Sequence, residues 1–272
     1  MTLQNMFILR APSILLTFDV EEFDLPLEFN QEVHHDVQMQ TGKKGLDIVS
    51  AMLSDNDIAC TMFTTGSFAK TFPGAVALIS EQHEIASHSL NHSAFKKSDL
   101  LESRLLLEKI SGKAVKGFRM PRMQMIDMKW LCDAGYSYDS SVNPTLMPGR
   151  YNNLNLPRTI YKDQNILRVP SSVTPNLRLP LFWLSFKNFP YSLYVKLALQ
   201  TLRRDGYLVL YFHPWEFTDL NHYVLPFYIK KHSGTQMQEN LNRLIIELKL
   251  NGQFETISSF LRNRVSRGSE NK

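Results

Sequence analysis

The sequence predicts an α/β fold with a largely parallel sheet, curled into a barrel and forming a single domain. Apolar strand-like runs alternate with helix-like segments along the chain, which is the order expected of a parallel sheet covered by helices. Polar residues that can do chemistry follow several of these runs. This pattern favours a barrel, because barrel active sites form at the C-terminal ends of strands. At 272 residues the chain has a length at which such barrels fold as one domain, and no repeat or low-complexity linker divides it.

The composition is that of an ordinary globular protein. Hydrophobic residues make up 43% of the chain and charged residues 21%. The net charge of +4 is mild, and no lysine/arginine block of the kind that marks nucleic-acid binding occurs. Residues 1–10 lack the features of a signal peptide, and no apolar run reaches the ~18 residues of a membrane span. We therefore expect a cytoplasmic protein that binds no nucleic acid and has no stable membrane insertion; its oligomeric state is not indicated.

The expected elements follow from apolar runs, helical spacing and breaker residues. Residues 14–18 form a compact apolar run that ends at an acidic group, and residues 207–212 are the most strand-like run. Pro73 suits the first turn of a helix and Gly135 suits a helix end. Strands are expected at residues 14–18, 58–64, 84–87, 116–120, 166–169 and 207–212, and helices at 42–55, 73–80, 98–110, 127–134, 191–204 and 236–250.

The segment of residues 140–180 is rich in Pro, Asn and Arg and shows little periodicity. A long irregular region inside a compact domain is usually functional. We therefore expect this segment to shape a substrate cleft.

The best metal-ligand spacing in the chain is that of His88 and His92. On a helical turn, residues four apart share one face, so both imidazoles could reach a single ion. Two histidines alone are a weak signal and need a carboxylate from elsewhere. Asp19, Glu21 or Glu22, which follow the first predicted strand, could supply it at the mouth of the barrel.

Four motifs occur in an order that one superfamily shares. They are Asp19-Val20-Glu21, His88-Ser89-Leu90-Asn91-His92, Phe118-Arg119-Met120-Pro121 and Phe212-His213-Pro214-Trp215-Glu216. Over about residues 14–260 the chain resembles the polysaccharide deacetylase (NodB-homology, carbohydrate esterase family four) superfamily, with residues 1–272 as one such domain. The resemblance implies a distorted (β/α) barrel of about seven parallel strands. It also implies a divalent metal, most often zinc, that serves to remove acetyl groups from N-acetylated sugars.

The resemblance assigns roles to the acidic group and to the two histidines. His88 and His92 would be metal ligands, and a carboxylate would complete a site that leaves room for water and substrate. The usual motif has adjacent aspartates, but Val20 occupies the second position here. Asp19 is therefore expected to be the general base and Glu21 the third ligand, because residues two apart on an extended strand face the same side. Glu22 is interpreted as a solvated charge, although it remains the alternative ligand.

Two further motif residues receive catalytic roles from the resemblance. Arg119 would orient the Asp19 carboxylate and keep it ionised. His213 would be the general acid that protonates the leaving amine. The usual aspartate–tryptophan motif that tunes this histidine has no clear match, and either Glu216 or Asp139 could replace it.

Substrate contacts are expected from Arg122, Tyr151 and Trp215. Arg122 stands where small residues are common, and it could contact an anionic sugar or form a salt bridge. Tyr151 and Trp215, together with Trp183, could stack on sugar faces, although a tryptophan is more often buried in a core.

The sequence thus predicts a metal-dependent deacetylase acting on an N-acetylated polysaccharide or on a biosynthetic intermediate of one. Two alternatives remain. The first is a non-sugar amidase of the allantoinase-like branch of the same superfamily. The second is a saccharide-binding protein with a degraded site, suggested by Val20. The sequence names neither the sugar nor the physiological metal.

Overall fold

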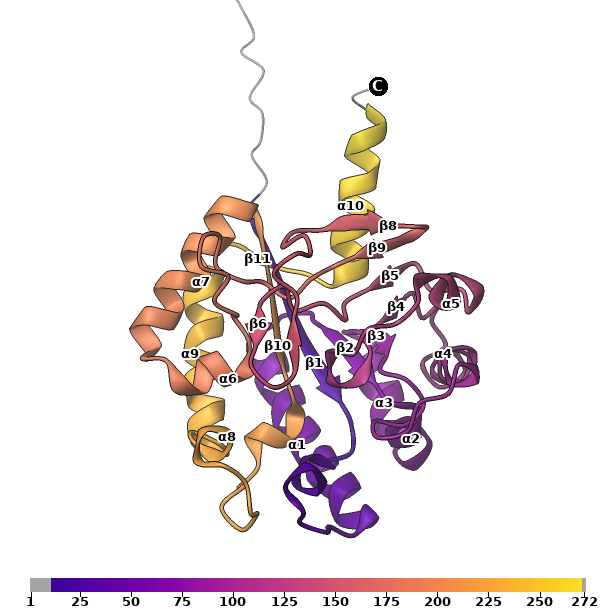
Figure 1. Ribbon diagram of the computed structural model, residues 1–272, viewed down its shortest axis with the longest axis vertical. Coiled ribbons are helices and arrows are strands. Elements are labelled where there is room, and N and C mark those ends of the chain that lie inside the picture. Colours follow the sequence, from indigo (N-terminus) through magenta and orange to yellow (C-terminus); the bar gives the residue numbers. More distant parts are fainter. Residues whose placement is uncertain (1–10, 271–272) are drawn as a thin grey trace, which may run out of the picture.

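The chain folds around one curled, mostly parallel sheet flanked by helices (Figure 1). The structure is a computed structural model that describes residues 11–270, so the expectation made for residues 1–10 lies outside the described residues. The strand order is β10-β1-β2-β3-β4-β5-β9-β8, with β11 added beside the start of β1. The strands are β1 (Ser13–Val20), β2 (Thr61–Thr64), β3 (Glu84–Ser87), β4 (Gly117–Phe118), β5 (Tyr138–Asp139), β8 (Tyr161–Asp163), β9 (Ile166–Arg168), β10 (Tyr207–Phe212) and β11 (Gln253–Phe254).

The seven strands from β10 to β9 in this order all run parallel, and only β8 is antiparallel to its neighbour. The barrel is distorted and incompletely closed. Beyond β9, Ser172 donates from its backbone N to Val209 O at 3.0 Å and accepts from Val209 N at 2.9 Å through its hydroxyl. These two bonds connect the segment that follows β9 with β10. The expected α/β class and distorted barrel are therefore confirmed.

Helices cover the outside of the sheet. They are α1 (His35–Asp55), α2 (Gly66–Thr71), α3 (Pro73–Ser80), α4 (Ser98–Ser111), α5 (Met128–Asp133), α6 (Trp183–Asn188), α7 (Tyr191–Asp205), α8 (Phe227–Lys230), α9 (Thr235–Lys249) and α10 (Ile257–Glu270), with short 3-10 turns η1 (Leu25–Phe29), η2 (Pro121–Met123) and η3 (Pro214–Phe217). A small hairpin of β6 (Leu146–Met147) and β7 (Tyr151–Asn152) lies in the segment that was expected to be irregular.

Most expected helices agree with the structure to within one or two residues, but α1 begins seven residues earlier than predicted. Its first two turns carry polar residues that give no apolar periodicity. The N-cap of α1 is His34, whose Nδ1 accepts a hydrogen bond from Asp36 N at 3.3 Å.

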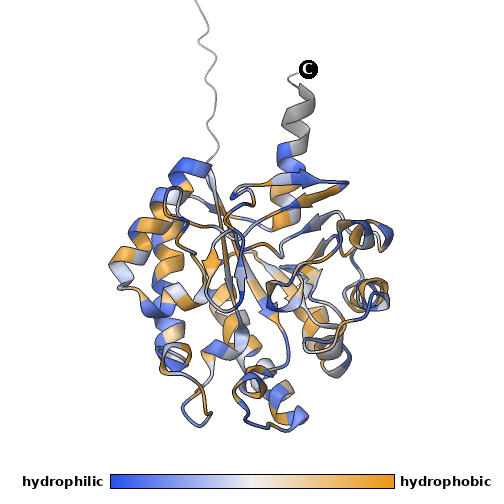
Figure 2. Ribbon diagram, viewed as in Figure 1, coloured by the Kyte–Doolittle hydropathy of each residue, from blue (hydrophilic) through white to orange (hydrophobic). Residues whose placement is uncertain are grey.

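The core consists of two layers separated by the sheet. Alternate residues of β1, from Ile14 to Val20, belong to the larger apolar cluster between the sheet and the helices. Leu15 faces the barrel interior and packs with Phe63 and Val209 in the smaller cluster. Helices α7 and α9 display both hydrophobic and hydrophilic residues (Figure 2), and their buried positions, such as Leu202 and Leu244, face the core.

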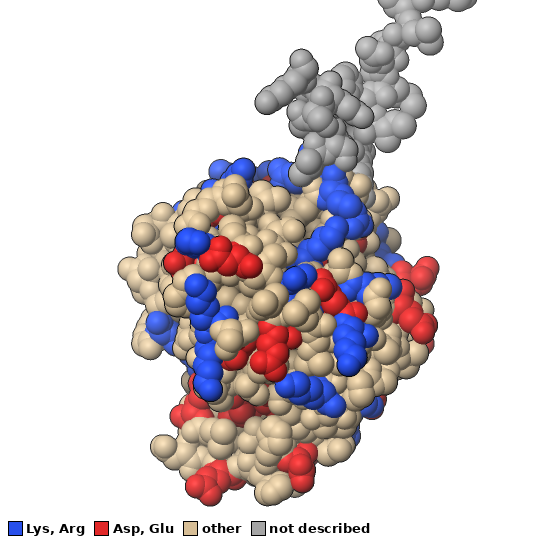
Figure 3. Space-filling view, turned by 90° about the vertical axis from the view of Figure 1, so that its right-hand side faces the viewer, with Lys and Arg blue, Asp and Glu red and all other residues tan. Residues whose placement is uncertain are grey.

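Charges are mixed on the molecular surface. On the face in Figure 3, Lys and Arg side chains are interspersed with Asp and Glu, as the small net charge of the chain leads one to expect. No helix within residues 11–270 combines the length and apolar character needed to cross a membrane.

Candidate metal centre and active site

Strand β1 delivers two carboxylates to the inside of the barrel. Asp19 is its penultimate residue, and Glu21 follows directly after its end. Val20, between them, is fully buried in the apolar cluster on the other face of the sheet. Because successive side chains of a strand point to opposite faces, the Asp-x-Glu spacing brings both carboxylates to one side.

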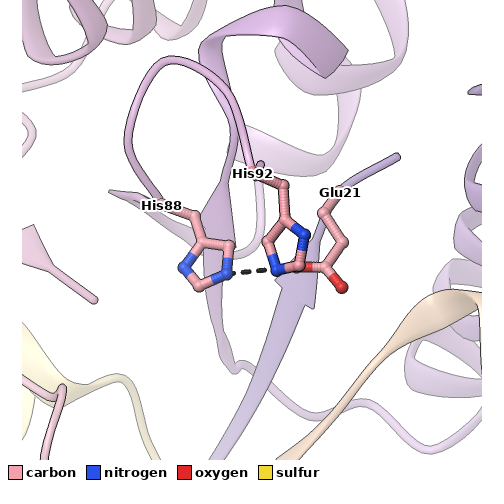
Figure 4. A group of neighbouring side chains, drawn as sticks. All are labelled: Glu21, His88 and His92. Carbon is pink, nitrogen blue, oxygen red and sulfur yellow. Dashed lines mark ion pairs between the residues drawn. The ribbon is translucent and has the colours of Figure 1, made fainter. Parts of the chain in front are cut away.

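Glu21, His88 and His92 converge at this edge of the sheet (Figure 4). Oε2 of Glu21 lies 3.1 Å from Nε2 of His88 and 3.2 Å from Nε2 of His92. Each residue offers one ligand atom, and these atoms all lie within 4.8 Å of one another. The structure thus brings together the three residues that the sequence suggested as ligands, with Glu21 rather than Glu22 in the group.

The expected reason for the histidine convergence was wrong. Residues 88–92 form a loop after β3 and not a helical turn. Ser89 has a left-handed backbone with a φ of 68°, which ends any helical path. The loop is fixed to the start of α2, because Gly66 N donates to Ser89 O at 2.9 Å and Ser67 N donates to Leu90 O at 2.7 Å.

Each histidine is oriented by a hydrogen bond at its other ring nitrogen. Nδ1 of His88 lies 2.8 Å from the carbonyl oxygen of Arg119, and Nδ1 of His92 lies 2.8 Å from Oδ1 of Asp24. Both contacts require an N–H at Nδ1, so both Nε2 atoms point toward Glu21. Metal-binding histidines typically have such partners.

Glu22 is not the solvated charge that the sequence suggested. Its side chain is buried; Oε1 accepts from His92 N at 3.0 Å and Oε2 accepts from the Thr65 hydroxyl at 2.8 Å. Glu22 is two residues after Val20 and so lies on the other side of the chain from Asp19 and Glu21. Its two hydrogen bonds connect the histidine loop to Thr65, the residue before α2.

The donor set fits a divalent metal. Oε2 of Glu21 is buried and has no hydrogen-bond partner among the described residues, although two imidazole nitrogens lie about one hydrogen-bond length away. Burial would lower the pKa of His92, but the charges of Glu21 and Asp24 raise it to about 9. Burial would likewise raise the pKa of Glu21, but the surrounding histidines hold it well below its usual range. Two histidines with one carboxylate are a ligand set of catalytic zinc sites.

Asp19 lies between the ligand cluster and His213. Its Oδ1 accepts from Nη1 of Arg119 at 2.5 Å. Its Oδ2 lies 4.0 Å from Nε2 of His88 and 3.9 Å from Nε2 of His213. The carboxylate is buried, so its free oxygen faces the space that the two imidazoles border.

Arg119 is fully buried and held on every side. Besides Asp19, it donates to the Thr17 hydroxyl at 3.0 Å and to the Ser140 carbonyl and hydroxyl at 3.1 and 3.0 Å. The guanidinium carbon lies 4.0 Å from the ring centre of Phe63. A guanidinium fixed in this way fixes the orientation of Asp19 in turn.

His213 follows β10 and is oriented by Glu216, one of the two residues proposed from the sequence. Oε1 of Glu216 accepts from the backbone N of His213 at 2.8 Å and from Nδ1 at 3.1 Å. The other candidate, Asp139, pairs instead with Nε of Arg168 at 2.7 Å. Burial would lower the pKa of His213, but its hydrogen bond to Glu216 and the charges of Glu21, Glu216 and Asp19 raise it.

The residues expected to bind substrate all line the same cavity, and each of them also has a partner within the protein. Trp215 is buried, donates from Nε1 to Oε1 of Glu21 at 3.1 Å and stacks on His213 with 4.7 Å between ring centres. Arg122 forms ion pairs with Asp24 and Glu28 and donates to the carbonyl of His92 at 2.9 Å.

These contacts of Arg122 correspond to the salt-bridge alternative left open by the sequence. Tyr151 lies on β7, and its hydroxyl accepts from the Asn143 side chain at 3.1 Å. Substrate binding by all three residues remains a prediction.

The cavity has a volume of about 310 Å³ and opens over the ligand cluster. One side carries the metal-ligating and catalytic candidates, and Arg150 lies at its rim. The lining also includes apolar residues, namely Leu25, Phe29, Phe182, Trp183, Leu184 and Ile229. The segment expected to shape a cleft contributes Met147, Pro148 and Tyr151.

Two glycines let α1 approach the site closely. A Cβ at Gly42 would overlap the carbonyl oxygen of Glu21, and a Cβ at Gly45 would overlap the carbonyl of Pro214. The backbone of α1 therefore packs directly against the segments that carry Glu21 and His213.

Sequence reasoning missed Asp24 and the two glycines. Asp24 lies three residues after Glu21 in a stretch without periodicity, and nothing in its spacing indicated that it reaches His92. Gly42 and Gly45 did carry a signal, because two glycines inside a helical pattern indicate a close backbone approach.

Comparison with known proteins agrees with this geometry. Residues 9–131 match the polysaccharide deacetylase family model. Among curated proteins none matches the chain significantly. Of the solved structures, a Mycobacterium smegmatis protein named as a polysaccharide deacetylase has a TM-score of 0.64 at 18% identity, with 95% of this chain and 92% of that chain covered.

Two further solved structures have similar scores. A Pseudomonas aeruginosa PAO1 protein named as a polysaccharide deacetylase has a TM-score of 0.65 at 14% identity, with 92% and 89% of the two chains covered. An allantoinase has a TM-score of 0.64 at 14% identity with the same coverage. At these identities the likenesses concern the fold. Together with the family match over residues 9–131, they confirm the resemblance to the polysaccharide deacetylase superfamily inferred from the motifs.

Proposed function

We propose that the protein is a metal-dependent hydrolase that removes the acetyl group from an N-acetylated saccharide, either a polysaccharide or a biosynthetic intermediate of one. The observation that carries the proposal is the position of Asp19. Its free carboxylate oxygen lies about equally far from a histidine of the ligand cluster and from His213, at 4.0 and 3.9 Å. The residues proposed as acid, base and metal ligands border one space, which supports a role in amide hydrolysis.

Glu21, His88 and His92 would hold the metal, and we take zinc as the most suitable ion for this ligand set. Bound zinc would act as a Lewis acid toward the acetyl carbonyl and would make a water molecule more acidic. Trp215, which donates to the second oxygen of Glu21, would restrict that carboxylate to one coordinating oxygen.

The chain's own residues would move the protons. Asp19, held by Arg119, would accept a proton from the water that attacks the acetyl carbon. His213, protonated at Nε2, would donate its proton to the amide nitrogen as the carbon–nitrogen bond breaks. The products are acetate and a free amino sugar, so the hydrolysis consumes one water molecule.

A cavity of about 310 Å³ lies at the lower end of the range for small-molecule sites, roughly 300–1,000 Å³. We infer that it holds one or two sugar units at a time. Tyr151 and Trp183 on its walls would pack against sugar faces. Arg150 at the rim, and Arg122 if its ion pairs rearrange, would meet an anionic substituent.

The decisive experiment uses the purified, zinc-supplemented protein and measures acetate release from a panel of N-acetyl sugars, nucleotide sugars and acetylated oligosaccharides, and amide-bond hydrolysis of ureides. Acetate from at least one sugar, lost in Asp19→Asn and His213→Ala, supports the proposal. Turnover of a ureide alone would favour the allantoinase-like alternative. Saccharide binding without turnover, in a protein that retains no zinc, would favour a binding protein and overturn the hydrolase proposal. The cytoplasmic location stays a prediction.

A further inference from the structure

Lys187 is a fully buried lysine in α6 for which the proposed reaction has no assigned use. Its Nζ lies 3.4 Å from Oε2 of Glu216 and donates to the carbonyl of Ile229 at 2.8 Å. The Glu216 side chain is also fully buried. The ammonium therefore has a carboxylate and one carbonyl as its polar contacts, and it lies close to Trp183 and Ile229, which line the active-site cavity.

A buried ion pair of this kind is not explained by stability. Removing an ammonium and a carboxylate from water costs several kcal/mol per ion, and an apolar pair of similar volume is often as stable. Burial also lowers the pKa of Lys187, which the Glu216 carboxylate only partly offsets. The contacts of the other Glu216 oxygen, Oε1, suggest a functional explanation for this pair.

That other oxygen holds His213 by two hydrogen bonds, from the backbone N at 2.8 Å and from Nδ1 at 3.1 Å. The three residues come from three elements: Lys187 from α6, Glu216 from η3 and His213 from the end of β10. Lys187, Glu216 and His213 thus form one line of contacts that ends at Nε2 of His213, 3.9 Å from Asp19.

We propose that Lys187 is a positioning residue for His213 that acts through Glu216: its ammonium fixes the orientation of the carboxylate and neutralises part of its charge. The positioning of His213 by Lys187 does not depend on the reaction, whereas its consequence for turnover rests on the proposed function.

The direction of the effect follows from the charges around the two groups. His213 faces Glu216, Asp19 and Glu21, with Tyr211 on its own strand, and Glu216 also faces Tyr194 of α7. Lys187 is the positive charge in contact with Glu216 on the side away from His213. Its removal leaves the carboxylate with its full charge, so the His213–Glu216 pair binds its proton more tightly.

The test is an NMR titration of the His213 imidazole in the zinc-loaded protein, with ¹³C-labelled histidine and with His213→Gln to assign the signal. Lys187→Met should move the titration midpoint of His213 upward by about half a unit or more. Glu216→Gln should move it downward. In the double variant the midpoint should equal that of Glu216→Gln alone, because Lys187 then has no carboxylate through which to act.

Lys230→Met is a matched control, since Lys230 in the neighbouring α8 also donates to a backbone carbonyl, that of Tyr223 at 3.1 Å. The His213 titration midpoint in Lys230→Met should equal that of the unmodified protein. Lys187→Gln, which removes the charge but retains a hydrogen-bond donor, provides the same comparison if Lys187→Met does not fold.

An unchanged midpoint in the folded Lys187 variants, or an equal shift with and without Glu216, would overturn the proposal and leave Lys187 as a packing residue. If turnover is found, the alkaline limb of its pH profile should move with the NMR midpoint. If no substrate is turned over while the midpoint still shifts, the proposed function fails and the positioning role stands.

Discussion

Nδ1 of His92 lies 2.8 Å from Oδ1 of Asp24, and this contact decides which nitrogen of the imidazole faces Glu21. Asp24 is itself held by Arg122, whose guanidinium also binds the carbonyl of His92. One carboxylate and one arginine therefore fix both the ring and the backbone of a proposed ligand. Loss of a partner of this kind typically weakens metal affinity by about 10–100-fold.

Asp24→Asn should weaken zinc binding by about 10–100-fold, because the amide no longer provides a charged acceptor for His92. Competition with a chromophoric chelator measures the affinity directly. Asp36→Asn is the control, since the Asp36 side chain is 84% exposed. Equal zinc affinity in Asp24→Asn and the control would contradict a supporting role for Asp24.

Zinc affinity should rise with pH up to about 9. In the metal-free protein the pKa of His92 is raised to about 9, so at pH 7 this imidazole carries a proton that the metal must displace. One displaced proton corresponds to an increase of up to about tenfold in affinity per pH unit. Calorimetry in buffers of different ionisation enthalpy should show about one proton released at pH 7. A pH-independent affinity between pH 7 and 8.5 would exclude this account.

Asp19→Asn should lower turnover by about 10²–10⁴-fold while zinc content stays unchanged, because Asp19 is proposed as the base and not as a ligand. Arg119 can still donate to the amide oxygen, so the fold should tolerate the change. Asp47→Asn, at an exposed i,i+4 pair with Lys43 on α1, is the control. If zinc is lost together with activity, Asp19 is a ligand and the assignment to Glu21 must be revised.

Gly45→Ala should destabilise the protein by about 1–3 kcal/mol, because the added Cβ overlaps the Pro214 carbonyl and pushes α1 away from η3. Gly74→Ala, in α3 with open space around it, should instead be neutral or stabilising by up to about 1 kcal/mol. Urea unfolding of both variants gives the comparison. The prediction fails if the two substitutions have the same effect.

The alternation rule predicted the carboxylate pair because it depends only on the strand, and β1 is a long, regular strand. Apolar runs and helical spacing are also local properties, and they predicted the α/β barrel. The histidine pair was found for the wrong reason. A left-handed residue at Ser89 closes the loop, and no spacing rule indicates such a turn when the residue is not glycine.

Contacts between distant segments could not be predicted in this way. Asp24 reaches His92 across 68 positions of the sequence, and Lys187 reaches Glu216 from a different helix. Their partners are determined by how loops fold back over the sheet. A local pattern gives the face on which a side chain lies, but not the loop that comes to meet it.

The burial of Val20 in the core fixes which side chains of β1 reach the site. Because Val20 is buried on one face of β1 while Asp19 and Glu21 lie on the other, the strand cannot slip by one residue without putting an apolar side chain, Phe18 or Val20, in the place of Asp19. A single-residue insertion or deletion within β1 would therefore displace the proposed base in either direction. Along an unbroken β1, the spacing of the two carboxylates can therefore change only in steps of two if both are to stay on the barrel face.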